Sequence, residues 1–278
     1  PDYKSGTKGA ATSHSGGKTT ITAIYSQLNW DINTQWDMAF GLRYEHFKSY
    51  GGYYNEDVTA TPELDLTSIP SNSTTKSSPK FSVGYQPKND WLIRYSIAKA
   101  YRFPIVEELF SQYQKYNTAS IANPGLKPEN GLHHNLMFDK LIDGGYLRVN
   151  IFQETVKNVI ESQTDTSTGL RTFIPVDEVQ TSGIEFIANV LGIFNPQLDM
   201  RLNITYVDSE ITKNAPDTSL EDNQFPRTPH WRSNLLTTYH ITTTWDVGGS
   251  EPYASDNFGS LNNKNNKANY VGTQANDT

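Results

Sequence analysis

The stretch from Ser96 to Glu129 reads SIAKAYRFPIVEELFSQYQKYNTASIANPGLKPE, and it decides how the rest of the chain is interpreted. Its first residues alternate as in a strand, with Ile97 on one face and small residues on the other. Pro104 has no backbone N–H to donate to a sheet, so it ends this strand. A long loop follows, and the dipeptides Asn123-Pro124 and Lys127-Pro128 stiffen its return to the next strand.

The same alternation marks strands along most of the chain. It is clearest from Gln35 to Phe47, where apolar residues such as Phe40 share one face and polar residues such as Arg43 share the other. Residues 1–18 and 255–278 show no period and are predicted to be loops. We expect about ten strands, at residues 21–30, 35–47, 80–86, 91–102, 132–141, 146–160, 179–190, 198–208 and 232–242, and from Trp245 onward.

The connections between these strands alternate in length. Long polar loops are expected at residues 48–78, 103–130, 161–171 and 209–229. Short turns are expected at residues 31–34, 87–90 and 142–145 and after Val190. Short connections at one end and long ones at the other are typical of an outer-membrane barrel, with the short turns in the periplasm and the long loops outside the cell.

Composition restricts the class of protein. The 278 residues carry a formal net charge of −7 without a basic patch, so no nucleic-acid partner is indicated. The sequence contains no cysteine, which excludes disulfides and thiolate metal sites. The mean hydropathy is −0.60, and no apolar run approaches the roughly 20 residues of a membrane helix. Hydropathy does not exclude a barrel, because only alternate residues of its strands meet lipid.

Strand length separates a membrane barrel from a soluble β-sandwich, which shows the same alternation. Strands of soluble proteins average about 5–6 residues, whereas a membrane-spanning strand needs about 9–11. Residues 36–46 and 91–101 reach that length. Four tryptophans lie at strand ends or beside short turns, where an aromatic girdle belongs, and three arginines fall on the polar faces (Trp30, Trp36, Trp91, Trp245; Arg43, Arg94, Arg201). The pattern favours the membrane barrel.

Three blocks in the opening stretch resemble the barrel of TonB-dependent outer-membrane receptors. They are Ala98-Lys99-Ala100-Tyr101-Arg102-Phe103-Pro104, Glu107-Glu108-Leu109-Phe110 and Asn123-Pro124-Gly125-Leu126-Lys127-Pro128-Glu129. Two further blocks fit the same family, Gly183-Ile184-Glu185 and Phe225-Pro226-x-Thr228-Pro229-x-x-Arg232. The resemblance extends over nearly the whole chain, from about Ile21 to Trp245.

The resemblance implies an all-β fold, an antiparallel transmembrane β-barrel segment with about ten of the roughly 22 strands of a complete barrel. Residues 1–278 would form a partial barrel domain, and we expect the plug domain and the closing strands to lie outside this sequence. The implied function is uptake of a scarce nutrient, mostly a ferric siderophore, driven by the TonB complex through the plug. The implied location is the outer membrane of a Gram-negative bacterium, with outer-membrane lipid around the barrel and no cofactor.

Candidate ligand contacts are aromatic and charged residues of the long loops: Tyr53, Tyr54, Arg102, Phe110, Tyr113 and Tyr116. The motif residues with an implied structural role are Tyr101, Arg102, Pro104, Glu108, Leu109, Asn123, Pro124, Pro128, Glu129, Gly183 and Glu185. For Arg102 and Glu129 we favour a brace between the loop ends and the barrel wall.

Residues 103–130 are expected to form an ordered loop with a short helical turn at Glu107–Phe110. Phe110 and Tyr113 would fold toward the barrel mouth and grip the ligand together with Tyr53 or Tyr54. In the alternative interpretation the motif only anchors the loop.

No enzymatic or metal site is indicated. His133 and His134 are neighbours in a strand and point to opposite faces, so they cannot share one ion. The sequence contains neither a nucleophile elbow nor a zinc-hydrolase motif. Two other functions stay open, a secreted β protein that binds carbohydrate through exposed tyrosines and a passive porin. Extraction only by detergent would argue against the first, and an upstream plug domain against the second.

Overall fold

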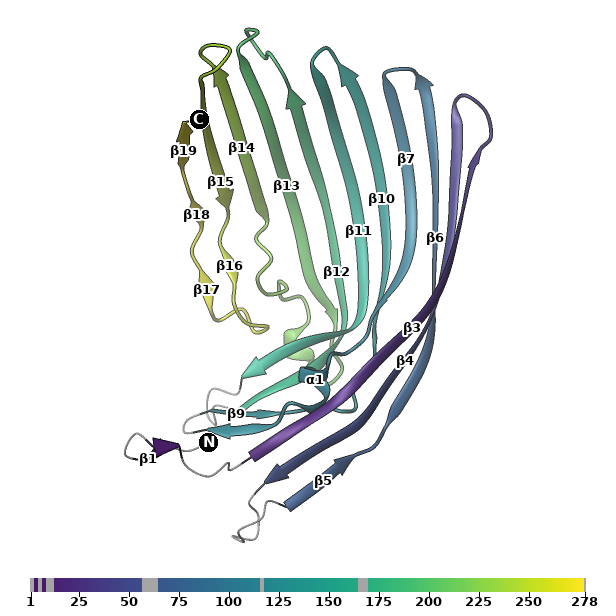
Figure 1. Ribbon diagram of the computed structural model, residues 1–278, viewed down its shortest axis with the longest axis vertical. Helices are drawn as coiled ribbons and strands as arrows, with labels where there is room; N and C mark the ends of the chain where they lie inside the picture. The colour runs from purple at the N-terminus through teal and green to yellow at the C-terminus, as the bar shows by residue number, and fades with distance from the viewer. Residues whose placement is uncertain are drawn as a thin grey trace.

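The computed structural model describes residues 3–4, 7–8, 13–56, 65–115, 118–164 and 170–277. Most of them belong to one curved sheet of long strands (Figure 1). The long strands are β3 (Ser13–Asp31), β4 (Trp36–Glu56), β6 (Asn72–Lys88), β7 (Trp91–Arg102), β10 (Glu129–Ile142), β11 (Gly145–Thr164), β12 (Leu170–Val190), β13 (Leu198–Lys213), β14 (Trp231–His240) and β15 (Asp246–Ala254).

Shorter elements decorate this sheet. The helices are α1 (Val106–Phe110) and the 3-10 turn η1 (Thr218–Leu220). The short strands are β1 (Tyr3–Lys4), β2 (Thr7–Lys8), β5 (Asp65–Ile69), β8 (Tyr113–Lys115), β9 (Thr118–Ile121), β16 (Asn257–Phe258), β17 (Asn266–Lys267), β18 (Tyr270–Val271) and β19 (Gln274–Asp277).

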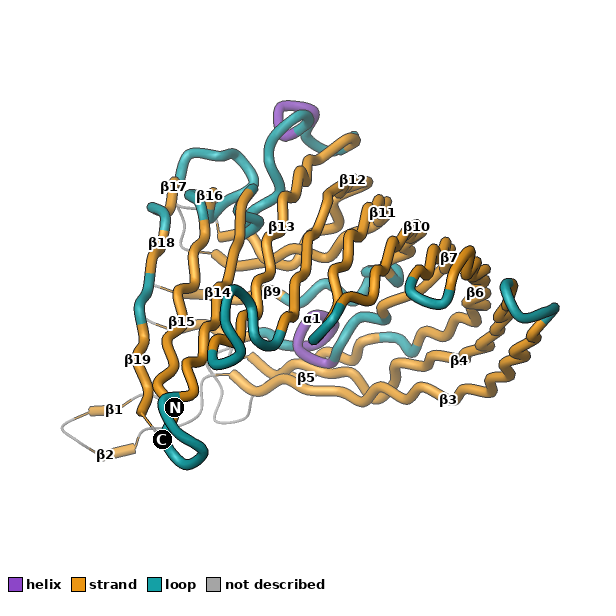
Figure 2. Tube along the Cα trace, turned by 90° about the horizontal axis from the view of Figure 1, so that it is seen from above, coloured by secondary structure: helices purple, strands orange, loops and turns teal. Residues whose placement is uncertain are grey.

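Consecutive long strands pair antiparallel with one another along the whole row from β3 to β15, as in a meander. Seen from above, the described strands form an open arc rather than a closed barrel (Figure 2). One edge of the arc is β3, and the other is β15 with its short partners β18 and β19. The predicted all-β antiparallel barrel segment is therefore confirmed.

The short and long connections lie at opposite ends of the sheet (Figure 1). At one end, hereafter the turn end, the chain reverses at residues 32–35, 89–90, 143–144, 191–197 and 241–245. At the other, the loop end, it runs through residues 103–112 with α1 and residues 214–230 with η1. The predicted short turns and the predicted helical turn in the motif loop are thus confirmed.

Several predicted loops are shorter than expected, because the strands continue into them. The predicted loop 48–78 contains the end of β4, all of β5 and the start of β6, and most of residues 161–171 belong to β11 and β12. β3 begins at Ser13 inside the predicted loop 1–18, β13 extends to Lys213, and residues 255–277 contain short strands. The reason is physical: ladder hydrogen bonds need only a neighbouring backbone, whereas the side-chain alternation used for prediction requires one wet and one apolar face.

The two faces of the sheet differ in chemistry over the middle of the strands. On the convex face Phe40, Phe81 and Ile97 are register partners across β4, β6 and β7, and the Phe40 side chain is 51% exposed. On the concave face Arg43 and Glu45 form an ion pair of 2.8 Å. Exposed apolar side chains on one face and paired charges on the other fit a wall between lipid and a wet lumen.

Two hydrophobic clusters lie at the loop end. The first, called here the loop cluster, consists of Phe47, Phe103, Leu109, Phe110, Leu126, Ile160 and Phe173. The second consists of Val176, Val179, Ile211, Leu220 and Leu261. Each joins strand residues to residues of a long connection, so these connections are packed against the wall. Within the described residues, no helix combines the length and apolar character needed to cross a bilayer.

Candidate functional site

The motif loop is tied to the wall by a brace centred on Arg102, the last residue of β7. Its guanidinium donates to Glu108 Oε1 of α1 at 2.9 Å and to Glu129 Oε1 of β10 at 2.7 Å. Glu129 Oε1 also accepts the backbone N–H of Ile160 on β11, and Glu108 Oε2 accepts that of Ile105 at 2.9 Å. The hydrogen bond to Glu129 and then that to Glu108 raise the pKa of Arg102 above its already high ordinary value. The positive charge of Arg102 is therefore paired with two carboxylates of the protein itself, those of Glu108 and Glu129.

Phe110 is wedged into the wall. Its side chain is only 1% exposed, and its ring lies against Gly17 of β3 and Gly52 of β4. A Cβ atom at either glycine would overlap the ring, so these two positions must lack a side chain. The ring therefore serves as an anchor between α1 and the edge of the sheet. Because the ring is buried, a ligand cannot reach Phe110 in this arrangement.

The return half of the loop is fastened through Asn123. Its Nδ2 donates to the backbone carbonyl of Phe173 on β12 at 3.0 Å, and its Oδ1 accepts the N–H of Gly125 at 3.2 Å. Its own N–H donates to the carbonyl of Glu108 at 3.0 Å. Pro124 and Pro128 flank this clip, while Leu109 and Leu126 lie in the loop cluster.

Two of the predicted tyrosines, Tyr53 and Tyr54, and the backbone of Tyr113 lie in one region of the loop end. Tyr53 and Tyr54 are half-buried on β4, where their register partners are Gly16 and Ser15 of β3, and Tyr53 Oη lies 3.3 Å from His14 Nδ1. Ser15 Oγ donates to the carbonyl of Gln112 and accepts its N–H, both at 2.9 Å. This bridge brings the start of β8, and hence the backbone of Tyr113, beside the β3–β4 pair. Tyr116 lies outside the described residues.

Other motif residues belong to the wall itself. Glu185 on β12 accepts hydrogen bonds from Asn150 on β11 at 2.8 Å and from Asn203 on β13 at 2.9 Å, which links three strands across the concave face. Gly183 lies under the ring of Phe152, with no space for a Cβ. Tyr101, the residue before Arg102, packs against the loop cluster from β7. These three motif residues therefore serve the packing and hydrogen bonding of the wall.

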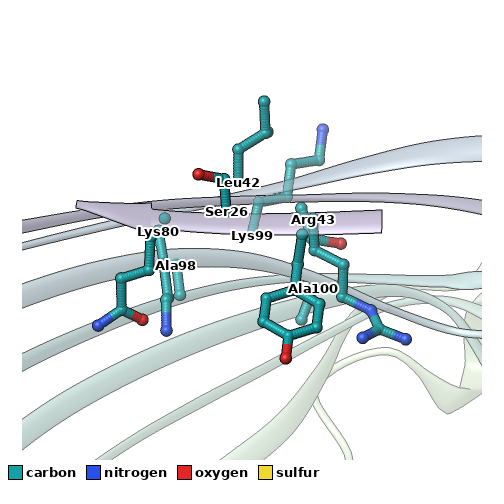
Figure 3. A pocket seen from close by; sticks show the side chains of 11 residues that line it. Ser26, Leu42, Arg43, Lys80, Ala98, Lys99 and Ala100 are labelled. Carbon is teal, nitrogen blue, oxygen red and sulfur yellow. The ribbon is translucent and has the colours of Figure 1, made fainter. Parts of the chain in front are cut away.

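A hollow of about 360 Å³ lies on the concave face of β3, β4, β6 and β7 (Figure 3). Arg43 and Lys80 point to this side of the sheet, whereas Leu42 and Lys99 point to the other (Figure 3). Lys80 has no ion-pair partner within the described part of the chain. Sequence reasoning missed this hollow, because its lining comes from four strands and carries no local signal.

Within the described segments, no group of three or more His, Asp or Glu side chains is placed to hold a metal ion. His133, for example, faces Glu154 at 3.4 Å across β10 and β11, whereas His134 contacts Tyr95 Oη at 2.8 Å. The residues described above can therefore present charged and aromatic side chains at the loop end.

Comparisons with known proteins agree with this architecture. The family model "TonB dependent receptor-like, beta-barrel" matches residues 1–277. The chain is 22% identical over 255 residues to a probable TonB-dependent receptor, BfrD, of Bordetella pertussis, covering 90% of this chain and 32% of that protein.

Among solved structures, the ferric yersiniabactin uptake receptor FyuA of Yersinia pestis superposes with a TM-score of 0.73 and 18% identity, over 95% of this chain and 38% of that one. The copper transporter OprC superposes with a TM-score of 0.70 and 14% identity, over 93% and 40%. These TM-scores establish a shared fold. The chain spans about a third of the length of its curated relative. With the family model matching nearly every residue, the chain belongs to the TonB-dependent receptors and forms part of their β-barrel.

Proposed function

We propose that this chain forms part of the wall and mouth of a receptor that imports a scarce, metal-bearing nutrient, a ferric siderophore, across the outer membrane of a Gram-negative bacterium. TonB supplies the energy, through a plug domain of the same receptor. The loop end faces the outside of the cell. The observation that carries this proposal is the Arg102 brace, which ties a motif-bearing loop to the wall of a barrel of this family.

The ligand contacts we propose are Tyr53 and Tyr54 at the loop end, together with Tyr113 and Tyr116 of the motif loop sequence. Tyrosine offers large contact area with few rotatable bonds, which suits a bulky ligand. Arg102 and Phe110, also candidates on sequence grounds, are assigned to holding the loop, because Arg102 pairs with two carboxylates and Phe110 is buried. No residue is assigned a catalytic role.

The cargo needs a direct test, because the two solved structures named above differ in theirs: one takes up ferric yersiniabactin and the other transports copper. The receptor is titrated with ferric catecholate, hydroxamate and carboxylate siderophores and with Cu²⁺ alone, and tryptophan quenching is measured. We expect saturable binding of one siderophore class, weakened several-fold in Tyr53→Ala/Tyr54→Ala. If Cu²⁺ binds and no siderophore does, the siderophore is wrong as the proposed cargo.

The orientation is tested by labelling single cysteines on intact cells with an impermeant maleimide. We expect a cysteine at Ser73 near the loop end to react and one at Gly144 in a turn to be protected. Equal labelling at the two positions would contradict the orientation.

The role of the loop is tested by deleting residues 112–119 and keeping both Asn123-Pro124 and Lys127-Pro128. Insertion into the membrane should be normal, because the brace and the loop cluster remain. If the affinity for the siderophore is unchanged, the loop is an anchor only and the contacts at Tyr113 and Tyr116 are wrong.

A further inference from the structure

At the turn end, the ring of His240 lies between two carboxylates that belong to neighbouring strands. His240 is the last residue of β14, Asp246 is the first of β15, and Asp199 is the second of β13. The ring atom Nδ1 lies 2.7 Å from Asp246 Oδ1, and Nε2 lies 3.1 Å from Asp199 Oδ2. Both distances are those of hydrogen bonds. One side chain therefore joins three strands that run side by side (Figure 1).

This geometry is complete only when the ring carries a proton on each nitrogen. A carboxylate can only accept hydrogen bonds, and a neutral imidazole has one N–H. A neutral His240 would therefore donate to one carboxylate and turn a lone pair toward the other. The hydrogen bond to Asp199, and then that to Asp246, raise the pKa of His240 above its ordinary value, because both favour the charged ring.

The same cluster fastens the turn between β12 and β13. Asp199 Oδ1 accepts the backbone N–H of Gly192 in this turn at 3.0 Å. The backbone N–H of His240 donates to the carbonyl of Gln197 at 2.8 Å, and Tyr239 Oη donates to Gln197 Oε1 at 2.8 Å. The end of β14 is thus attached to the preceding turn through its backbone, its tyrosine and its histidine, and the charge of the ring affects one of these three attachments.

The other charged groups around the ring are few. β13 contributes Arg201, two residues beyond the paired aspartate and on the same face of the strand. The flanking turns, residues 191–197 and 241–245, contain no acidic, basic or histidine residue. β19 places Asp277 in register with the second residue of β15. Among the described side chains of these elements, His240 is the group whose ordinary pKa lies closest to neutral pH.

We propose that His240 is a proton-dependent clasp, which ties the turn end of β14 to both β13 and β15 only while the ring is charged. After loss of one proton, an N–H at Nδ1 keeps the shorter contact with Asp246, whereas Nε2 presents a lone pair to Asp199. The link between β14 and β13 is therefore the one that opens. The clasp depends neither on the cargo nor on the orientation proposed above.

The sign of the pH dependence follows from the direction of the shift. A group whose pKa is higher in the folded than in the unfolded protein stabilises the fold while it is protonated. For His240 this contribution is complete below the ordinary histidine pKa of about 6.5, and it is lost as the pH rises through the higher value of the folded protein. Each unit between the two values corresponds to about a tenfold change in the folding equilibrium constant.

The first test is the titration of the ring by NMR in the detergent-solubilised full-length receptor, labelled with 15N-histidine. The signals of His240 are those missing in His240→Gln. We expect a midpoint above about 6.5 in the wild type, and a lower midpoint in Asp199→Asn because one carboxylate is lost. A wild-type midpoint at or below the ordinary value overturns the clasp. So does a raised midpoint that neither Asp199→Asn nor Asp246→Asn lowers.

The second test compares urea titrations of the wild type and His240→Gln, refolded into vesicles, from about pH 5 to about pH 8. The variant should be less stable at the acidic end, and the difference should shrink as the pH rises. The matched control is Tyr239→Phe, which removes a neutral hydrogen bond to the same turn and should cost the same at every pH. A loss in His240→Gln that does not vary with pH would mean that the ring only packs, and the clasp would be wrong. A receptor that shows the expected pH dependence but binds no siderophore would count only against the proposed transport function.

Discussion

The middle of the wall and the loop end are stabilised by different means, although the same strands run through both. In the middle, each strand separates an apolar convex face from a polar concave face, as at Phe40 and Arg43. At the loop end this alternation is lost, and the chain is held by the loop cluster and by the brace at Arg102. A barrel wall therefore needs the bilayer to define its faces, whereas the loop end carries a small core of its own.

This difference predicts how substitutions in the two regions will affect the protein. A change in the middle of the wall alters the match between protein and lipid, and its effect depends on which face it touches. A change at the loop end alters a core of ordinary packing and ion pairs, and its effect depends on burial. Four substitutions test this division.

Phe110→Ala is expected to have the largest effect and to be confined to the loop end. Removing a buried phenylalanine costs about 3–5 kcal/mol, and here the loss falls on the docking of α1 against β3 and β4. Hydrogen exchange of residues 103–112 should accelerate strongly while that of β10 and β11 stays slow. The same substitution at Phe194, which is 92% exposed, is the control and should change nothing. Uniform acceleration over the whole sheet would contradict the division.

Phe40→Arg tests the middle of the wall. A charge on the lipid-facing side near the midplane costs about 2–4 kcal/mol of folding free energy. Ala39→Arg, one residue away and on the concave face, should cost much less because that face is wet. Urea titrations of the receptor refolded into vesicles measure both. Equal losses for the two variants would mean that the faces are wrongly assigned.

Arg102→Gln removes the centre of the brace and leaves Glu108 and Glu129 without their cation. We expect a loss of about 2 kcal/mol in loop stability, since hydrogen bonds to charged groups are strong but this guanidinium is partly exposed. Protease cleavage within residues 103–128 should increase. Arg102→Gln/Glu129→Gln should lose less than the sum of the two single variants, because the two side chains interact. Additive losses would argue that the two side chains act independently.

Gly84→Ala tests the concave face of the wall and should have the smallest effect. Arg94 of β7 reaches across Gly84 on β6 to pair with Asp37 of β4 at 2.8 Å, and a Cβ at Gly84 would overlap both side chains. Displacing a partly exposed ion pair and overpacking the site should cost about 1 kcal/mol. Ser82→Ala on the same strand is the control. A loss as large as that of Phe40→Arg would show that the concave row matters as much as the lipid face.

Sequence patterns were sufficient wherever one strand carried the information by itself. The alternation around Phe40, the hairpin turn at Asp143-Gly144 and the helical turn after Pro104 are all present as expected. The motif blocks also contain the three residues of the brace, Arg102, Glu108 and Glu129. The ends of the strands were placed less well, since β4 and β11 continue into polar segments with no alternation.

The sequence by itself determined the antiparallel barrel wall, its short and long connections and its family, because alternation, turn residues and motifs are local properties of the chain. Only the tertiary structure decided that Phe110 is an anchor, that Arg102 is engaged on both sides, and that β6 and β7 separate beyond Lys80 and Ala98. These outcomes depend on which distant residues lie opposite one another, such as Gly17 and Gly52 around Phe110. Burial and strand separation arise from contacts between segments far apart in sequence, and no local pattern records them.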